Sequence, residues 1–177
     1  MRAIARTLLL LTATLASAQV NLPANGRLDS AKIQTSGERA IFAIFHASWC
    51  SWCKRLDAFL GSPEIQPVID KYFVQVYFTV QEHGDKKDLN TPGADEFLNQ
   101  WGGNDSGLPF FAFLDSKGVM VVNSIEPPRD GRKAANIGFP DADHEVDWFL
   151  TMLSKAAPAM TAGERATLEK SLRPPKK

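Results

Sequence analysis

The sequence predicts an α/β fold in which a central mixed sheet of four or five strands is flanked by helices. An apolar run at 41–45 leads through a pair of cysteines into a helical pattern at 54–60, and a second strand pattern follows at 73–80. A strand, helix, strand unit of this length implies a right-handed crossover between parallel strands. Two further strand patterns over 110–122 are joined by a short turn, so they form an antiparallel hairpin and make the sheet mixed.

The first strand and the helices after it have clear signals. Residues 41–45 are apolar without alternation, which is typical of a central strand buried on both faces, and His46 stands at its exit. After the first helix, the Ser-Pro-Glu sequence at 62–64 is typical of a helix start with proline at the first helical position. This pattern predicts a short helix toward Lys71, limited by Pro67, with a single turn of helix as the safer prediction.

The middle of the chain alternates between strand and helix patterns. Residues 73–80 are rich in β-branched and aromatic side chains, which favours a strand. The charged and polar stretch 81–91 predicts a solvated loop. A helix is then expected from the Thr-Pro sequence at 91–92 to the two glycines at 102–103.

The last third of the chain follows the hairpin. Residues 126–141 contain proline, glycine and charged residues without a period, so we expect a long loop that covers part of the active face. Residues 143–156 place apolar side chains on one helical face until Pro158 stops the run. The sequence at 161–164 has capping-box spacing and predicts a short last helix.

Residues 1–18 are expected to be a secretory signal peptide. They contain arginines at positions 2 and 6, then a leucine-rich apolar run, then the small-residue sequence Ala16-Ser17-Ala18. The mature chain is therefore expected to begin near Gln19. The apolar run is short for a bilayer span, so we expect cleavage rather than an uncleaved anchor, and no stable membrane insertion afterwards.

The remaining residues are expected to form one domain with two appendages. Residues 19–37 are a polar N-terminal extension with at most one short helix or strand near 28–35. Residues 38–157 form the domain, and residues 158–177 form a C-terminal helix followed by a basic tail.

Charge and composition exclude several classes of partner. The chain has 20 Lys and Arg and 20 Asp and Glu, and the signal carries two of the basic residues and none of the acidic ones, so the mature net charge is about −2. The basic residues are scattered rather than gathered on one stripe. We therefore expect no nucleic-acid binding and no attraction to an anionic membrane surface, and we expect a monomer.

The two cysteines of the chain, Cys50 and Cys53, are separated by two residues and lie where the first helical pattern begins. A helix N terminus has unsatisfied N–H groups and a positive end, so a thiolate is favoured at Cys50. Cys53 lies one turn further along, where it should be less exposed and able to attack a mixed disulfide formed at Cys50. This arrangement predicts thiol-disulfide exchange.

The cysteine pair could also serve as a structural crosslink, a haem attachment site or half of a metal site. A structural disulfide that closes four residues contributes about 2 kcal/mol, against roughly 3 kcal/mol for fifteen residues, so it is a weak crosslink. A c-type haem site needs histidine directly after the second cysteine, where Lys54 stands. Structural zinc needs four ligands and would have to recruit scattered histidines from positions 46, 83 and 144. We expect no cofactor and no metal.

With these elements in this order, the chain resembles the thioredoxin-like family over residues 38–155. The motif that carries the resemblance is Trp49-Cys50-Ser51-Trp52-Cys53. The resemblance implies a thioredoxin-like fold in which Cys50 is the nucleophile, Cys53 is the resolving thiol and Trp49 shields the pair.

A second point of resemblance is Leu108-Pro109, which lies where the family carries a cis proline next to the cysteines. The resemblance implies that the Leu108 backbone pairs with an extended client segment as an added strand. From the residues alone, a trans Pro109 at the start of a strand is an alternative. Trp52 lies between the cysteines at a helix tip, so we expect exposed, client-facing surface rather than a core aromatic.

The chain also departs from the family. Thioredoxins usually hold a buried acid six residues before the first cysteine, where it helps to move the proton of the resolving thiol, but this chain has Ile44 there. The Ser51-Trp52 dipeptide replaces the Gly-Pro of reductive thioredoxins, so the sequence gives no cue to the reduction potential. His46 is an auxiliary candidate that either assists the thiolate and its proton or is an ordinary structural histidine.

The sequence therefore predicts a periplasmic or secreted thiol-disulfide oxidoreductase, a protein disulfide reductase or isomerase. Its partners would be protein thiols and disulfides and one redox partner that the sequence does not identify. The alternative is a thioredoxin-fold binding protein or chaperone with little redox turnover, and a metal chaperone is a third candidate.

Overall fold

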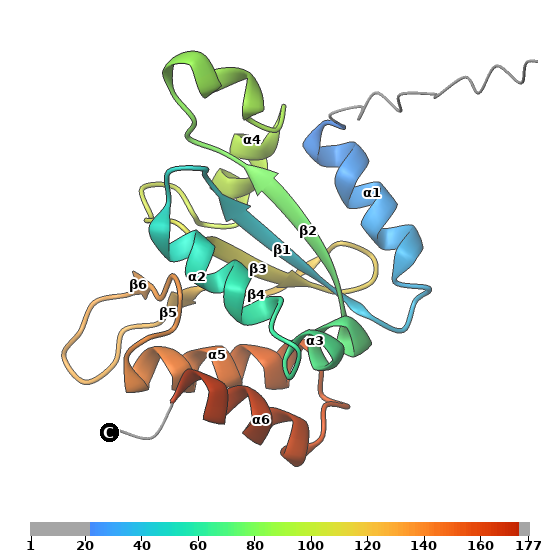
Figure 1. Ribbon diagram of the computed structural model, residues 1–177, viewed down its shortest axis with the longest axis vertical. Helices are drawn as coiled ribbons and strands as arrows, with labels where there is room; N and C mark the ends of the chain where they lie inside the picture. Colours follow the sequence, from blue (N-terminus) through green and yellow to red (C-terminus); the bar gives the residue numbers. More distant parts are fainter. Residues whose placement is uncertain (1–21, 174–177) are drawn as a thin grey trace, which may run out of the picture.

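The computed structural model describes residues 22–173 (Figure 1). The signal peptide expected at 1–18 and the last four residues of the basic tail lie outside the described residues. Along the chain the elements are α1 (Ala24–Gln34), β1 (Ala40–His46), α2 (Ser51–Leu60), α3 (Gln66–Tyr72), β2 (Phe73–Thr79), the 3-10 helix η1 (Gly84–Leu89), α4 (Ala94–Gln100), β3 (Phe110–Leu114), β4 (Met120–Asn123), β5 (Ile125–Glu126), β6 (Ala135–Asn136), α5 (Asp143–Ala156) and α6 (Ala162–Leu172).

The central sheet has four strands in the order β2-β1-β3-β4. β1 runs parallel to β2 and antiparallel to β3, and β3 runs antiparallel to β4. α2 and α3 form the crossover between the parallel strands. The predicted mixed sheet is therefore confirmed, with four strands, and its topology is that of the thioredoxin-like fold. β5 and β6 form a separate two-stranded sheet inside the stretch that was expected to be a loop.

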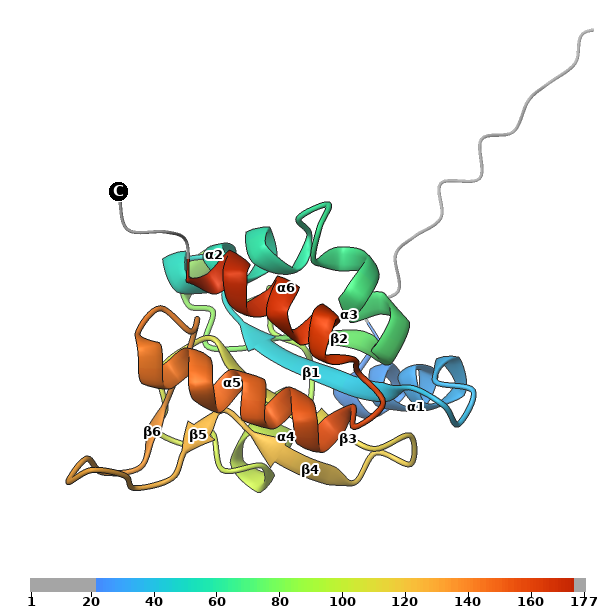
Figure 2. The ribbon, with the colours of Figure 1, turned by 90° about the horizontal axis from the view of Figure 1, so that it is seen from below.

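Helices cover both faces of the sheet, as the two views show together (Figures 1 and 2). One core cluster joins alternate residues of β1 to α2, α3, α5 and α6, and the other joins the opposite side of β1 to α1 and α4. Residues Ile41–Phe45 are fully buried, because they face helices on both sides. This burial explains the run of apolar residues without alternation.

Phenylalanine side chains fill the core on the α2 side of the sheet. Phe42 on β1 packs against Phe113 on β3 with ring centroids 4.5 Å apart, and Phe113 also lies 4.7 Å from Phe73 on β2. Phe149 from α5 meets Phe111 edge-on at 5.9 Å. These contacts connect three strands and a helix through aromatic rings, whose large area makes each a major contributor to stability.

The two appendages expected from the sequence pack onto the domain. α1 occupies 24–34 rather than a short element near 28–35, and it lies against β2 with Leu28 and Ala31 in the core. α6 buries Leu168 and Leu172 in the opposite core cluster. The predicted capping box is present, since the Thr161 hydroxyl accepts a bond from Glu164 N and the Glu164 carboxylate accepts one from Thr161 N.

The expected start of the helix after α2 is wrong. The Ser-Pro-Glu sequence at 62–64 forms turns, and α3 begins at Gln66 with Pro67 in its first turn. Proline is tolerated there because the first N–H groups of a helix have no partner within it. Pro67 therefore fits the start of α3 rather than limiting its length.

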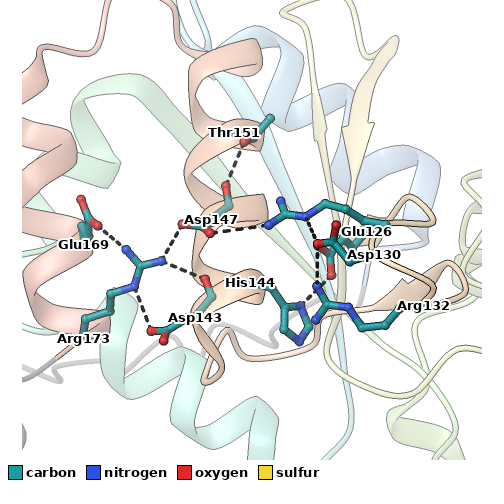
Figure 3. Close-up of polar contacts among 10 residues, drawn as sticks. Glu126, Asp130, Arg132, Asp143, His144, Asp147, Thr151, Glu169 and Arg173 are labelled. Atoms are coloured by element: carbon teal, nitrogen blue, oxygen red, sulfur yellow. Dashed lines mark hydrogen bonds and ion pairs between the residues drawn. The ribbon is translucent and has the colours of Figure 1, made fainter.

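Polar and charged side chains connect α6 and the β5–β6 hairpin (residues 125–136) to α5 (Figure 3). Asp147 on α5 accepts a 2.6 Å bond from Arg173, and its other oxygen lies 3.9 Å from Arg129. His144 on the same helix contacts Glu126 at 2.7 Å. The exposed Arg129–Asp147 pair contributes little, about 0 to 1 kcal/mol, whereas the Glu126 carboxylate is buried. The cluster joins both segments to α5.

Replacing Phe113 with alanine should lower the free energy of unfolding by about 3 to 5 kcal/mol, because it leaves a cavity among rings that do not collapse into it. Urea titration at neutral pH measures the change. Val121→Ala on the exposed side of β4 is the control and should change stability by less than about 0.5 kcal/mol. Equal effects of the two substitutions would contradict the assignment of the aromatic core.

Candidate active site

Cys50 and Cys53 form a disulfide at the N terminus of α2. Cys50 is the N-cap residue of that helix, and its sulfur accepts a 3.0 Å hydrogen bond from the backbone N–H of Cys53. β1 ends at His46, so the cysteines follow the carboxyl end of the central strand after a short turn. The helix N terminus favours negative charge on the Cys50 sulfur when the pair is reduced.

The expected exposure of Cys50 is not met in the disulfide state. Cys50 is 4% exposed and Cys53 is 2% exposed, so both are buried, although their order is as expected. The cause is packing by Ala47 from the turn before the helix and by Leu108 from the loop before β3.

The Leu108–Pro109 peptide bond is cis, as predicted. Pro109 is buried directly before β3, and Leu108 packs against the cluster formed by Ala47, Cys50 and Cys53. Asn136 on β6 donates from its side-chain amide to the carbonyl oxygens of Gly107 at 2.6 Å and Pro109 at 3.0 Å. The loop before β3 is therefore held in place by two sets of contacts: Leu108 packs against the cysteines, and Asn136 binds the backbone on either side of Leu108.

The two tryptophans of the motif are exposed. Trp49 is 56% exposed, and its indole N–H donates a 2.9 Å bond to the carbonyl oxygen of Gln81. Trp52 is 45% exposed and stacks on Phe139 with centroids 6.4 Å apart. The Arg55 guanidinium lies 4.6 Å from the Trp52 ring centroid and 4.7 Å from that of Phe139. Neither indole is a core side chain.

A buried carboxylate holds the backbone just before Cys50. Glu82 is 3% exposed, and its carboxylate accepts bonds from the backbone N–H of Ser48 and, at 3.0 Å, from the Ser48 hydroxyl. The Ser48 N–H bond, more than any other interaction, lowers the pKa of Glu82. Gln81, the neighbour that binds Trp49, has a φ of 58°, a left-handed conformation that is uncommon outside glycine.

Three titratable side chains lie near one another between α2 and the sheet. They are Asp57 on α2, His46 at the end of β1 and Tyr77 on β2. Asp57 lies four residues after Cys53, so the two side chains share one face of the helix. Burial is the main cause that raises the pKa of Asp57 and of Tyr77, and the main cause that lowers the pKa of His46. One Asp57 oxygen, Oδ1, is buried without a hydrogen-bond partner among the described residues.

His46 also has a structural contact, because its Nε2 lies 3.3 Å from the Thr79 hydroxyl. Ile44 stands at the position where thioredoxins carry an acid. It is fully buried on the face of β1 that packs against α2. A carboxylate is thus present on the α2 side of the sheet, supplied by the helix instead of the strand.

Sequence reasoning missed four residues around the disulfide: Asp57, Glu82, Asn136 and Phe139. The spacing of Asp57 from Cys53 was a usable signal, since residues four apart share a helix face. The other three lie in or after loops, where no periodicity shows which side chain faces the cysteines. Within residues 22–173, no group of three or more His, Cys, Asp and Glu gathers as a metal site would require.

Comparison with solved structures finds distant similarity to thiol-disulfide proteins. A structure titled DsbH Oxidoreductase is 19% identical, covers 87% of this chain and 95% of its own, and superposes with a TM-score of 0.42. The oxidised C-terminal domain of DsbD from Neisseria meningitidis is 20% identical, covers 74% and 97%, and has a TM-score of 0.44. A disulphide isomerase from Xylella fastidiosa Temecula1 is 21% identical, covers 66% and 80%, and has a TM-score of 0.42.

No protein-family model and no curated protein matches this chain. At such distance from the solved structures, the fold assignment rests on the chain's own strand order and on the place of the cysteine pair at the start of α2.

Glu82→Gln should make stability less dependent on pH in the acid range. The folded-state pKa of Glu82 is lowered, so its carboxylate stabilises the folded protein above the ordinary glutamate pKa, and this contribution is lost as pH falls through the lowered value. Urea titrations at neutral and acid pH measure the difference. Asp85→Asn, an exposed acid in the adjoining 3-10 helix η1, is the control and should keep the wild-type profile. A wild-type profile for Glu82→Gln would contradict the role given to the Ser48 contact.

Proposed function

We propose that this chain is an exported thiol-disulfide oxidoreductase that acts on protein disulfides, as a reductase or an isomerase. The observation that carries the proposal is the Cys50–Cys53 disulfide at the N terminus of α2, beside the cis Leu108–Pro109 bond of a thioredoxin-like fold. A four-residue crosslink adds little stability, so exchange explains this placement better than a structural role does.

The reaction begins with the reduced pair. The Cys50 thiolate attacks one sulfur of a client disulfide, which forms a mixed disulfide and releases the other client sulfur as a thiolate that takes up a proton. The Cys53 thiolate then attacks Cys50, which releases the second client thiol and leaves the Cys50–Cys53 disulfide. The client gains two electrons and two protons, and a dithiol partner must reduce the pair again.

Asp57 is the proposed proton acceptor for Cys53. The thiol must lose its proton before it attacks, and Asp57 lies on the same helix face with an unpartnered buried oxygen. Burial raises the pKa of Asp57, which makes its carboxylate a better base than an exposed aspartate. His46 beside it is an auxiliary group whose positive form would stabilise the carboxylate.

The client is proposed to lie along the loop before β3. The Leu108 N–H and C=O have no hydrogen-bond partner among residues 22–173, which leaves them free to pair with an extended segment. Trp52 is on the same side and offers exposed apolar surface, while Trp49 flanks the disulfide on the side of Gln81.

The proposed location is the periplasm or the exterior, because the sequence at 1–18 has the features of a cleavable signal peptide. Among the described residues, no helix combines the length and the apolar character needed to cross a bilayer. We propose that the exported chain acts as a monomer.

Substituting the cysteines singly should separate their roles. Cys53→Ser should accumulate mixed disulfides between Cys50 and client proteins, because the resolving thiol is gone, and Cys50→Ser should capture none. Non-reducing gels followed by mass spectrometry of the trapped proteins measure both. Greater capture by Cys50→Ser, or none by Cys53→Ser in the exported fraction, would reverse or remove these roles.

The exposed indoles also fit a binding protein or chaperone that does not turn over. A catalytic amount of the reduced chain, supplied with a dithiol, distinguishes the two functions. The oxidoreductase should accelerate reduction or reshuffling of a protein disulfide in many turnovers, whereas a chaperone would act only in stoichiometric amount and would do so in the Cys50→Ser variant too.

Asp57→Asn should slow the release of a peptide held on Cys50 by about 10²-fold, the usual scale for loss of a general base. In the wild type, release should slow as pH falls through the raised pKa of Asp57, because the protonated acid accepts nothing from Cys53. The variant should lose this acid limb. Rapid-mixing fluorescence over a pH series measures it, with Asp88→Asn, at an exposed position in η1, as the control. An unchanged pH profile would exclude Asp57 as the base.

A further inference from the structure

A groove of about 420 Å³ runs beside the disulfide. Three segments form its walls: the start of α2, the loop before β3, and the stretch 136–145 that contains the end of the hairpin and the start of α5. The lining residues that matter for recognition are Trp52, Leu108, Asn136, Phe139, Asp141 and Glu145. Most of the third segment lies in the stretch that was expected to be a loop without regular structure.

One side of the groove exposes free backbone groups. The Asn136 amide occupies the carbonyl oxygens of Gly107 and Pro109, on either side of Leu108. The Leu108 N–H and C=O between them are without a partner among residues 22–173. An unpaired backbone pair at a fixed loop is suited to an extended peptide, which adds to it as a strand.

Another part of the groove lining is a wall of stacked side chains. Trp52 and Phe139 lie nearly parallel, at 20°, and the Arg55 guanidinium packs over both rings. Asp141 fixes Arg55 with a 2.9 Å ion pair. Because the contacts of Arg55 bring together residues far apart in the sequence, the wall is assembled before any client binds. Its apolar faces suit a large apolar side chain.

The charge of the groove is negative. Asp141 and Glu145 are among the lining residues, and no Lys, Arg or His of the described chain is. Arg55 balances Asp141, and the Glu145 carboxylate accepts bonds from the backbone N–H groups of Asp141 and Ala142 at the N terminus of α5, which supply partial positive charge but no cation. Within residues 22–173, one carboxylate of the groove is therefore left without a cation, and a positive client side chain complements it.

We propose that this groove selects extended client segments in which an aromatic or large aliphatic side chain stands two residues from the reacting cysteine and a Lys or Arg stands two residues beyond. This inference rests on the proposed oxidoreductase function and names its substrate class. Alternate residues of an extended strand face the same side. In the proposed complex, the client cysteine meets Cys50, the apolar side chain meets the wall of Trp52 and Phe139, and the cation meets Glu145.

The test is a set of peptides, each joined by its cysteine to a small thiol, that the reduced chain cleaves. Wild-type kcat/KM should be about tenfold higher with Phe than with Ser at the apolar position. It should be about threefold higher with Arg than with Glu at the charged position, with the charge preference weakening in high salt. The set includes peptides with the apolar and charged residues on the N-terminal side of the cysteine and peptides with them on the C-terminal side.

Variants assign the preferences to the groove. Phe139→Ala and the milder Phe139→Leu should reduce the preference for Phe, and Glu145→Gln, which removes the carboxylate assigned to the client cation, should reduce the preference for Arg. Asp130→Asn is a matched control, because Asp130 is an exposed acid of the same hairpin that does not line the groove. It should keep both preferences.

Reduction of 2-hydroxyethyl disulfide, which fills no part of the groove, distinguishes the two levels of the proposal. If the wild type reduces this compound but cleaves all peptides equally, the groove assignment is overturned and the oxidoreductase function stands. If it reduces neither, both are overturned. Preferences that persist in both Phe139 variants would also overturn the groove as the recognition site.

Discussion

Burial of β1 on both of its faces is the constraint on which the rest of the structure depends. Two helical layers must cover this strand, so the chain places α1 and α4 on one side and α2, α3, α5 and α6 on the other. A strand buried in the middle of a sheet has a fixed end, and the cysteine turn starts from that end. The precision of the site therefore follows from the core, because Cys50 is four residues beyond the last strand residue.

The site combines one rigid element, α2, with two neighbouring loops that side-chain hydrogen bonds hold in place. α2 carries the disulfide, the Trp52 and Arg55 wall and Asp57, so these groups keep their spacing as parts of one helix. The loops on either side are attached by side-chain bonds to backbone groups, from Glu82 on one side and Asn136 on the other. A functional constellation held on a helix is more precise than one held on loops, and here the loops contribute mainly to what binds.

The sheet, the order of its elements and the place of the cysteine pair at the start of α2 were predictable because each has a local signal. Residues 41–45 indicate a doubly buried strand, and the cysteine spacing at a helix start indicates exchange chemistry. Burial of Cys50 was not predictable, since it depends on Leu108, which approaches from far along the sequence. The same reason hid Glu82 and Asn136: their partners are backbone groups in other loops, and only tertiary structure reveals such pairs. The α3 start was misplaced because two prolines, at 63 and 67, both fit a helix N terminus.

The attachment of the β5–β6 hairpin through Asn136 has a consequence for local unfolding of the protein. The Asn136 amide, the Arg129–Asp147 ion pair, the His144–Glu126 contact and the buried Ile137 connect the stretch 125–141 to the rest of the protein, while its own sheet has two short strands. A segment with so few backbone ladder bonds detaches at a lower free energy than the four-stranded sheet unfolds. We therefore expect the segment that bounds one side of the groove to exchange its amide hydrogens by sub-global opening, at a lower free energy than β1 and β3.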